Sequence, residues 1–536
     1  MRKYLSIVML SMIAVTATAV PARRGAIIRT AADGTEKEVY LHGNAFGHYM
    51  TDAEGTWLDE TSLMPMSEEA KQARLQVINE RKQARRVQAA QMVGNKPNAA
   101  PRGLLILVNF ADKAFVTPYD TIKNMLDGDN FTRHYEYSYT IGGRTYNETV
   151  NSAGSARQYF HDQSYGQYNP IFDVVGPYTL SQNLAYYGKN SASGDDANVG
   201  AMVKEACELA DKGGADFTLY DNDNNGIVDF VYILYAGYGE ADGGPTETVW
   251  PHNYRQSYYG TKYACTVDGK KIDNYACSNE INYINDMYNG IGTFCHEFSH
   301  VLGLPDLYET NVNLKGLHTL LDWDILDYGP YLNDGNTPPN YSAYERWFMG
   351  WIEPTLLNTD CSVTLPPLQD SKAACLITES GQGISNILLP LPNTFFLIEN
   401  RQQEGWDTYL KGSGMMLTKV QWNKSKWANN TVNNTSTKLG VDIIEAKANT
   451  SSYSDKATDL YPKGNTECLK TEPFFLYNIA MSNRIITFDV NDGGEMIVLE
   501  VESVQHSELS VRKVIENGQV IIIREGQKFD ILGNRL

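Results

Sequence analysis

The residues with the clearest chemical potential lie in one short stretch, residues 291–306, which contains the pattern His-Glu-x-x-His. His296 and His300 are four residues apart, so in a helix both imidazoles project from one face with the spacing that binds a single zinc ion. Asp306 follows six residues later and is predicted to return as a third, oxygen ligand. Three protein ligands leave one position for water, which is the arrangement of a catalytic zinc site.

Glu297, next to the first ligand, is the predicted general base. Its carboxylate can take a proton from a zinc-activated water and later pass it to a leaving amine. The five-residue motif alone also fits a surface helix with two unrelated histidines. The surrounding residues favour the metal site, because apolar side chains gather on the opposite helical face and Gly303 supplies the positive φ that ends a helix.

A second metal pattern lies in residues 221–229, where acidic and amide residues alternate before a glycine. It matches the first nine positions of a calcium loop, and the expected ligands are Asp221, Asp223, Asn225, the Ile227 carbonyl and Asp229. Position twelve is Tyr232 instead of a bidentate Glu, so the segment is not a complete EF-hand. It predicts one structural calcium completed by other residues. The alternative is an acidic turn that leads into a strand.

The start of the chain has the features of a signal peptide. Two basic residues precede an apolar run, and a small-residue cleavage site ends at Ala19, so residues 1–19 are predicted to direct export. No later apolar stretch reaches the length that spans a bilayer, so no transmembrane segment is expected. The net charge of −19 argues against nucleic acid as a partner. We therefore expect a secreted or cell-surface protein.

The remaining composition predicts four regions. Residues 20–100 combine strand-like runs, a solvated helix at 67–92 and a Pro- and Gly-containing linker, which fits a removable pro-segment or an ordinary small domain. Residues 101–360 mix apolar strands with amphipathic helices and form the predicted catalytic domain. Residues 361–490 show short alternating runs, which predict an antiparallel β-rich domain, and residues 491–536 predict a hairpin-like tail.

The role of one tyrosine and the pairing of the cysteines remain open. Tyr328, in a tight aromatic turn after the zinc helix, is the candidate for stabilising a tetrahedral oxyanion. The chain has seven cysteines, and an exported protein can pair them. The short-loop pairs are Cys265 with Cys277 and Cys361 with Cys375, and free buried thiols are the alternative.

These residues together resemble a known family. The signal peptide, the pro-segment and His296-Glu-x-x-His300-x-x-Gly303-x-x-Asp306 are similar to the immune inhibitor A family of secreted bacterial zinc metallopeptidases. The likeness continues in Phe395-Phe-Leu-Ile-Glu-Asn-Arg401, Gly405-Trp-Asp407 and Gly412-x-Gly414.

The resemblance implies an α+β fold, with a metzincin-like zinc-peptidase domain followed by a β-sandwich-like domain, a propeptide and calcium sites. His296, His300 and Asp306 carry over as zinc ligands, and Glu297 carries over as general base. One departure is Leu326, which stands where the family's turn beneath the zinc usually has Met. The last segment of the chain is similar to tails that the type IX secretion machinery recognises, or is a plain terminal hairpin.

The predicted function is a secreted zinc-dependent endopeptidase that hydrolyses peptide bonds of extracellular proteins. Its substrate is expected to lie extended along an edge strand near residues 275–283, adding a strand by main-chain hydrogen bonds. The alternative is a non-catalytic, peptidase-like surface adhesin, against which the presence of Glu297 argues. A second alternative, a serine hydrolase, finds no Gly-x-Ser-x-Gly elbow in the sequence.

Overall fold

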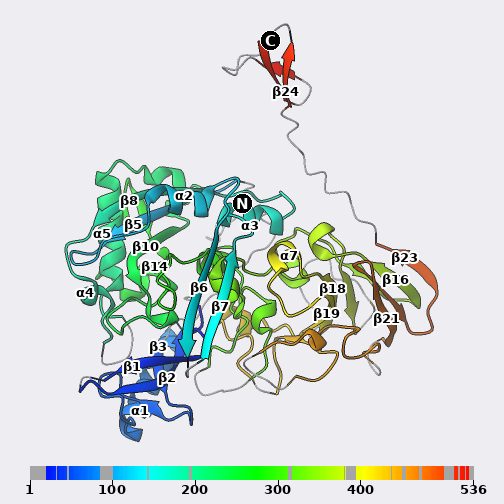
Figure 1. Ribbon diagram of the computed structural model, residues 1–536, viewed down its shortest axis with the longest axis horizontal. Helices are drawn as coiled ribbons and strands as arrows, with labels where there is room; N and C mark the ends of the chain where they lie inside the picture. Colours follow the sequence, from blue (N-terminus) through cyan, green and yellow to red (C-terminus); the bar gives the residue numbers. More distant parts are fainter. Residues whose placement is uncertain are drawn as a thin grey trace, which may run out of the picture.

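The structure is a computed structural model (Figure 1). It describes residues 20–31, 33–44, 47–84, 100–141, 144–191, 196–311, 317–379, 381, 394–435, 437–449, 454–469, 474–499, 512–516, 519–524 and 527–529. The predicted signal peptide lies outside these residues. So does most of the linker that was expected to follow the first helix. No helix in the described part of the chain is long and apolar enough to cross a membrane.

The leading region, drawn in blue in Figure 1, is a small sheet with one helix. Its strands are β1 (Ala26–Thr30), β2 (Glu36–Asn44), β3 (Gly47–Thr51) and β4 (Trp57–Leu58), paired in sequence order. Helix α1 (Glu68–Ala84) begins one residue after the predicted start. The apolar residues of this sheet share a core cluster with Ala241 and Trp250, so the region packs directly on the catalytic domain.

A five-stranded sheet forms the centre of the catalytic domain. Its order is β11 (His252–Arg255), β14 (Asn274–Ile281), β10 (Val231–Tyr238), β5 (Arg102–Asn109) and β8 (Ile171–Thr179). The continuous apolar run at the start of this domain is strand β5, buried between two parallel neighbours, which confirms the predicted central strand. Only β11 runs antiparallel to its neighbour.

Helices cover both faces of this sheet because alternate strand residues face opposite ways. Leu104 and Ile106 pack with α5 (Val199–Lys212) in one cluster, whereas Leu105 and Leu107 pack with the other face's helices. Those helices include α3 (Ala156–Gln163) and α6 (Gly292–Val301). The other elements of the domain are α2 (Tyr119–Asp127), α4 (Leu184–Gly188), α7 (Ala343–Phe348), the hairpin β6 (His134–Ile141) with β7 (Arg144–Asn151), and the small sheet β12 (Cys265–Val267), β13 (Lys270–Ile272), β9 (Ile227–Val228).

The predicted substrate-binding edge is wrong for the first half of its span. Residues 274–277 of β14 pair with β11 on one side, and β10 lies on the other, so this half of β14 is interior. The edge strand on this side of the sheet is β11, which the sequence did not suggest because its four residues carry no apolar alternation.

The region after residue 354 contains two sheets with a shared apolar core. The first has the order β15 (Thr355–Leu356), β17 (Cys375–Thr378), β18 (Phe395–Arg401), β19 (Gly414–Val420), β20 (Val441–Ile443); the second has β21 (Leu476–Ser482), β22 (Ile485–Val490), β16 (Cys361–Leu365), β23 (Glu495–Val498). Most pairs are antiparallel, but β15 with β17 and β16 with β23 are parallel, which corrects the purely antiparallel expectation. Strand β23 also extends this sheet past the expected boundary at 490.

The tail and the cysteines complete the description. Strands β24 (Arg512–Glu516), β25 (Gln519–Arg524) and β26 (Gln527–Phe529) form a three-stranded antiparallel sheet, one strand more than a hairpin. All seven cysteines are free and buried, so neither short-loop pair is a disulfide. A core of this size does not depend on covalent links.

Candidate metal centre and active site

Helix α6 (Gly292–Val301) carries His296, Glu297 and His300, and its apolar face fixes its orientation. The rings of Phe294 and Phe298 pack edge-on against Phe172 of β8, with centroids 4.9 and 5.1 Å away. The opposite face therefore turns both imidazoles away from the sheet, as the helical phase predicts. Gly303 follows with φ 91°, the left-handed conformation expected at the helix end.

Three ligand atoms meet beside this helix. His296 Nε2 and His300 Nε2 are 3.1 Å apart, and each lies 3.3 Å from Asp306 Oδ1. Tetrahedral zinc with bonds of 2.0–2.1 Å places its ligands roughly 3.3 Å from one another. Asp306 Oδ1 is buried and has no hydrogen-bond partner among the described residues. The predicted trio thus fits one zinc ion, and the position of this oxygen is explained by a cation.

Backbone carbonyls hold both imidazoles in the ligand orientation. His296 Nδ1 lies 2.6 Å from the Ile325 carbonyl and His300 Nδ1 lies 2.7 Å from the Leu304 carbonyl. An Nδ1–H donated to a carbonyl leaves the Nε2 lone pair for the metal. The turn that contains Ile325 is the one that carries Leu326 in place of the family's Met. Leu326 is fully buried in the core beneath the site.

Asn430, from the C-terminal β region, orients the third ligand. Its amide donates to Asp306 Oδ2 at 2.5 Å and accepts from the Asp306 backbone N–H at 2.8 Å. Asn430 follows α8 (Lys424–Ala428), 124 residues beyond Asp306 in the chain. No local spacing relates the two residues, so sequence reasoning missed this contact. The β region therefore contributes to the metal centre.

Glu297 is completely buried beside the three ligands. Burial raises its pKa well above the usual range, Asp306 adds to the increase, and the backbone N–H groups of Val20 and Asn253 oppose it. Burial raises the pKa of Asp306 less than the two imidazoles lower it, so its pKa falls to about 2. Asp306 is thus the ionised carboxylate of the predicted ligand trio, and Glu297 is the carboxyl group whose proton affinity is raised.

The leading segment, residues 20–23, contacts Glu297 and residues near it. The Val20 N–H donates to Glu297 Oε1 at 2.9 Å, and the Val20 side chain is buried. Tyr331 donates its hydroxyl to the Pro21 carbonyl at 2.6 Å, and the Arg23 guanidinium pairs with Asp334 at 3.1 Å. Residues 20–23 therefore lie against Glu297 and against two residues of η5 (Gly329–Gly335).

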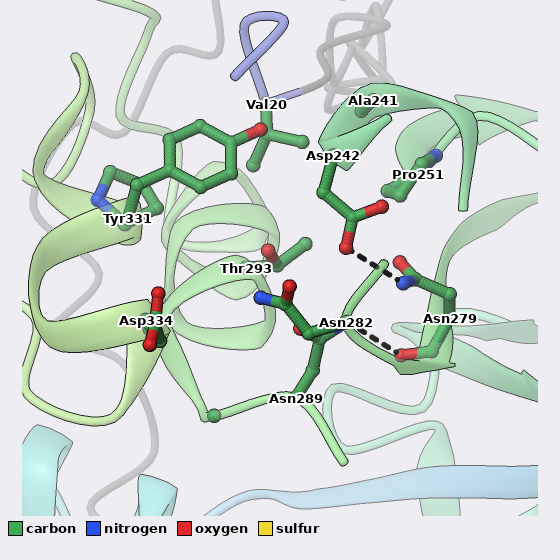
Figure 2. Close-up of a pocket in the computed structure, with 13 residues that line it drawn as sticks. Val20, Ala241, Asp242, Pro251, Asn279, Asn282, Asn289, Thr293, Tyr331 and Asp334 are labelled. Atoms are coloured by element: carbon green, nitrogen blue, oxygen red, sulfur yellow. Dashed lines mark hydrogen bonds between the residues drawn. The ribbon is translucent and has the colours of Figure 1, made fainter. Parts of the chain in front are cut away.

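A polar pocket adjoins Val20 (Figure 2). Asp242 and Asp334 contribute carboxylates to its lining, and three amide side chains complete its polar part: Asn279, Asn282 and Asn289. Asp242 accepts a hydrogen bond from Asn279 at 3.1 Å, while its other oxygen has no hydrogen-bond partner among the described residues. Burial raises the pKa of Asp242 to about 6. The pocket is thus an acidic cavity beside Val20, the residue that contacts Glu297.

Tyr308 and Tyr328 are the two candidates for stabilising a tetrahedral oxyanion. The Arg24 guanidinium covers the ring of Tyr328 at 3.4 Å from the centroid. Burial raises the pKa of Tyr328, and the charges that act on it belong to Arg24, Asp327 and Glu309. Burial likewise raises the pKa of Tyr308, but there the charges belong to Asp306 and Glu297.

Tyr308 follows Asp306 by only two residues in the chain, and sequence reasoning passed over it. The role predicted for Tyr328 stays a prediction.

The predicted calcium loop is a tight turn in which side chains cap backbone N–H groups. Asp221 accepts from the N–H groups of Asn225 and Gly226, and Lys270 places its ammonium 2.6 Å from Asp221 Oδ2. Asp229 is engaged by Asn222 instead. The calcium ligands Asp221, Asp223, Asn225, Ile227 and Asp229 remain a prediction, with a lysine cation at the first of them.

Comparison with known proteins agrees with this geometry. Residues 89–351 match the model of the immune inhibitor A peptidase M6 catalytic domain. The pre-pro-metalloprotease PrtV of Vibrio cholerae is 29% identical over 219 residues, 36% of this chain and 23% of PrtV. Immune inhibitor A of Bacillus thuringiensis subsp. alesti is 25% identical over 275 residues, 46% of this chain and 39% of that protein. The chain thus aligns with well under half the length of these relatives.

Proposed function

Residues 89–351 of the chain belong to the immune inhibitor A peptidase M6 family of metallopeptidases, and from this premise we propose that the protein is a secreted zinc-dependent endopeptidase acting on extracellular proteins. The observation that carries the proposal is the convergence of His296, His300 and Asp306 beside the buried Glu297. A zinc site with a purely structural role would not require that carboxyl group.

The chain's own residues divide the chemistry between them. His296, His300 and Asp306 hold the zinc, which when bound polarises the scissile carbonyl and lowers the pKa of water. Glu297 accepts the proton of the attacking water and returns it to the leaving nitrogen, a role that suits its raised proton affinity. Tyr308 or Tyr328 supplies a hydroxyl toward the charge that develops on the carbonyl oxygen.

The leading region is proposed to keep the enzyme latent. Val20 hydrogen-bonds to Glu297, and Arg23 and Arg24 hold the segment across the site through Asp334 and the Tyr328 ring. Signal-peptide cleavage after Ala19, as the sequence predicts, would turn the Val20 nitrogen into a cation facing the general base. Removing the region then opens the site. A chain lacking residues 20–100 that is no more active than the full chain would exclude latency.

The acidic pocket is proposed to receive a basic substrate side chain next to the scissile bond. Arg23 of the leading segment already pairs with Asp334 there, and its charge lowers the pKa of Asp242 against the effect of burial. Cleavage of a peptide library should therefore favour Lys and Arg at one position beside the cut. An equal preference for Glu at that position would contradict the proposal.

The test of function is proteolysis by the processed protein under control of its metal. Casein hydrolysis is expected, a chelator should abolish it, and about one equivalent of zinc per active site should restore it. Hydrolysis that survives complete zinc removal would refute the metallopeptidase proposal. A processed, zinc-loaded protein that never cleaves casein would favour the adhesin alternative. Secretion by the type IX machinery and the calcium site remain predictions outside this test.

A further inference from the structure

A second cluster of ligand-type side chains lies outside the active site. Among the described residues, only two groups bring three His, Cys, Asp or Glu ligand atoms within 4.8 Å of one another. One is the active-site trio, and the other consists of His318, Asp455 and Asp459. His318 precedes η4 (Leu321–Trp323), whereas Asp455 precedes η8 (Ala457–Asp459) in the C-terminal region and Asp459 is its last residue. The cluster thus joins two distant parts of the chain.

We propose that His318, Asp455 and Asp459 form a second zinc site, which ties the C-terminal β region to the turn beneath the catalytic centre. The proposal stands whether or not the protein is a peptidase, because none of these residues belongs to the active site.

Asp455 is the strongest indication of a cation. Its side chain is fully buried, and Oδ1 has no hydrogen-bond partner in the described part of the chain. This oxygen points toward the cluster, 3.7 Å from His318 Nε2. The other oxygen accepts from the Asp322 backbone N–H at 2.7 Å, so the carboxylate is held in place with one oxygen left for a ligand role. A buried carboxylate oxygen without a partner is costly unless a cation offsets it.

His318 is arranged as a metal ligand. Glu445 Oε1 lies 2.9 Å from Nδ1, the ring nitrogen that does not face Asp455, at ion-pair distance but without hydrogen-bond geometry. A carboxylate beside one ring nitrogen favours the proton there and leaves the other nitrogen for a metal, as in carboxylate–histidine–zinc arrangements.

The side-chain amide nitrogen of Asn449 lies close to four acceptor atoms of the cluster and its surroundings. It lies 3.2 Å from His318 Nε2, 3.1 and 3.4 Å from the two oxygens of Asp459, and 3.1 Å from the Ser454 carbonyl. An amide nitrogen has two hydrogens to offer to these four atoms. A divalent cation can engage all of them, and the Asn449 amide could then present its oxygen instead.

The charge around the cluster also favours a cation. Carboxyl groups of Asp322, Asp442 and Glu445 surround the three ligands, and the facing cations are Arg24, Lys411 and Lys419. Arg24 belongs to the leading segment, so its removal leaves the carboxyl groups with less compensation. The imidazole selects zinc over calcium, since calcium takes oxygen ligands and zinc accepts nitrogen.

The experiment counts zinc in the full chain. The protein is stripped with a chelator, reloaded with zinc chloride, desalted and measured by mass spectrometry of the metal. We expect about two zinc ions per wild-type chain, about one in His296→Ala/His300→Ala, and none when His318→Gln is added. In the His296→Ala/His300→Ala chain, zinc should also raise the Tm by at least about 3 °C.

Controls separate loss of the site from loss of the fold. His161→Gln removes an exposed imidazole that lies beside Asp162 and should leave the zinc count unchanged. Asp455→Asn keeps the side-chain volume and should lose one zinc with an unchanged circular dichroism spectrum. The proposal is overturned if His296→Ala/His300→Ala binds no zinc, if folded Asp455→Asn keeps both ions, or if calcium and not zinc raises the Tm.

Discussion

The two ligand clusters of this molecule are built in opposite ways. In the active site, two ligands and the base lie within five residues of one helix, and the third follows at Asp306. The ligand atoms of His296, His300 and Asp306 are 3.1–3.3 Å apart. In the cluster of His318, Asp455 and Asp459, more than 130 residues separate the imidazole from the carboxylates, and His318 Nε2 lies 3.7 Å from Asp455 Oδ1. A helix preorganises the first cluster, whereas only tertiary packing assembles the second.

This difference predicts unequal consequences when one imidazole is removed from each cluster. His300→Ala removes a ligand of the catalytic ion and should reduce proteolysis by at least about a thousandfold. His318→Gln should remove one zinc ion and lower the Tm. It should reduce activity less than about tenfold, because His318 affects the active site only through the turn beneath it. Paired measurements of kcat/KM and zinc content test both. Equal losses of activity in the two variants would contradict this difference between the clusters.

The next effect concerns the contact between the two regions. Asn430→Ala leaves Asp306 without the amide that orients it, and such changes typically cost about 10–100-fold in metal affinity or activity. The matched control is Asn434→Ala, four residues further along the same loop, where the amide contacts Thr310 instead of a ligand. Competition with a chelator measures the zinc affinity of both. If the two variants behave alike, Asn430 does not position the ligand.

The smallest effect concerns the pH dependence of the leading region. Burial would lower the pKa of His48, but Glu240, 3.1 Å away, outweighs burial and raises it from 6.5 to about 9. A raised histidine pKa stabilises docking fully below pH 6.5, and this contribution is lost as the pH rises through about 9. A chain nicked in the linker should therefore release its leading region more readily at pH 9.5 than at pH 6.5.

Size-exclusion chromatography of the nicked chain measures that release, and His48→Gln should flatten the pH dependence. Glu60 and Asp196 also raise the pKa of this imidazole, and Asn190 Oδ1 lies 2.8 Å from its Nε2. Release that is greater at pH 6.5 than at pH 9.5 would contradict the ion pair.

The sequence predicts what local periodicity determines. The apolar run of β5, the helical phase of α6 and the left-handed Gly303 each follow from neighbouring residues, and the structure confirms them. Prediction from the sequence fails where segments far apart in the chain contact each other. Asn430 on Asp306, Val20 on Glu297 and the short edge strand β11 depend on tertiary packing that leaves no local pattern.

The substitution of Leu326 shows a third case. Its apolar character and volume predict a place in the apolar floor beneath the site, and Leu326 is fully buried in the core cluster that includes Phe294 and Phe298.

The central claim is that Glu297 moves protons beside a zinc ion held by His296, His300 and Asp306. The most direct test is the Glu297→Gln variant of the processed protein, assayed for zinc content and casein hydrolysis together. We predict an unchanged zinc count and a loss of activity of about a hundredfold to ten-thousandfold. A Glu297→Gln protein that keeps its zinc and cleaves casein at the wild-type rate would contradict the claim.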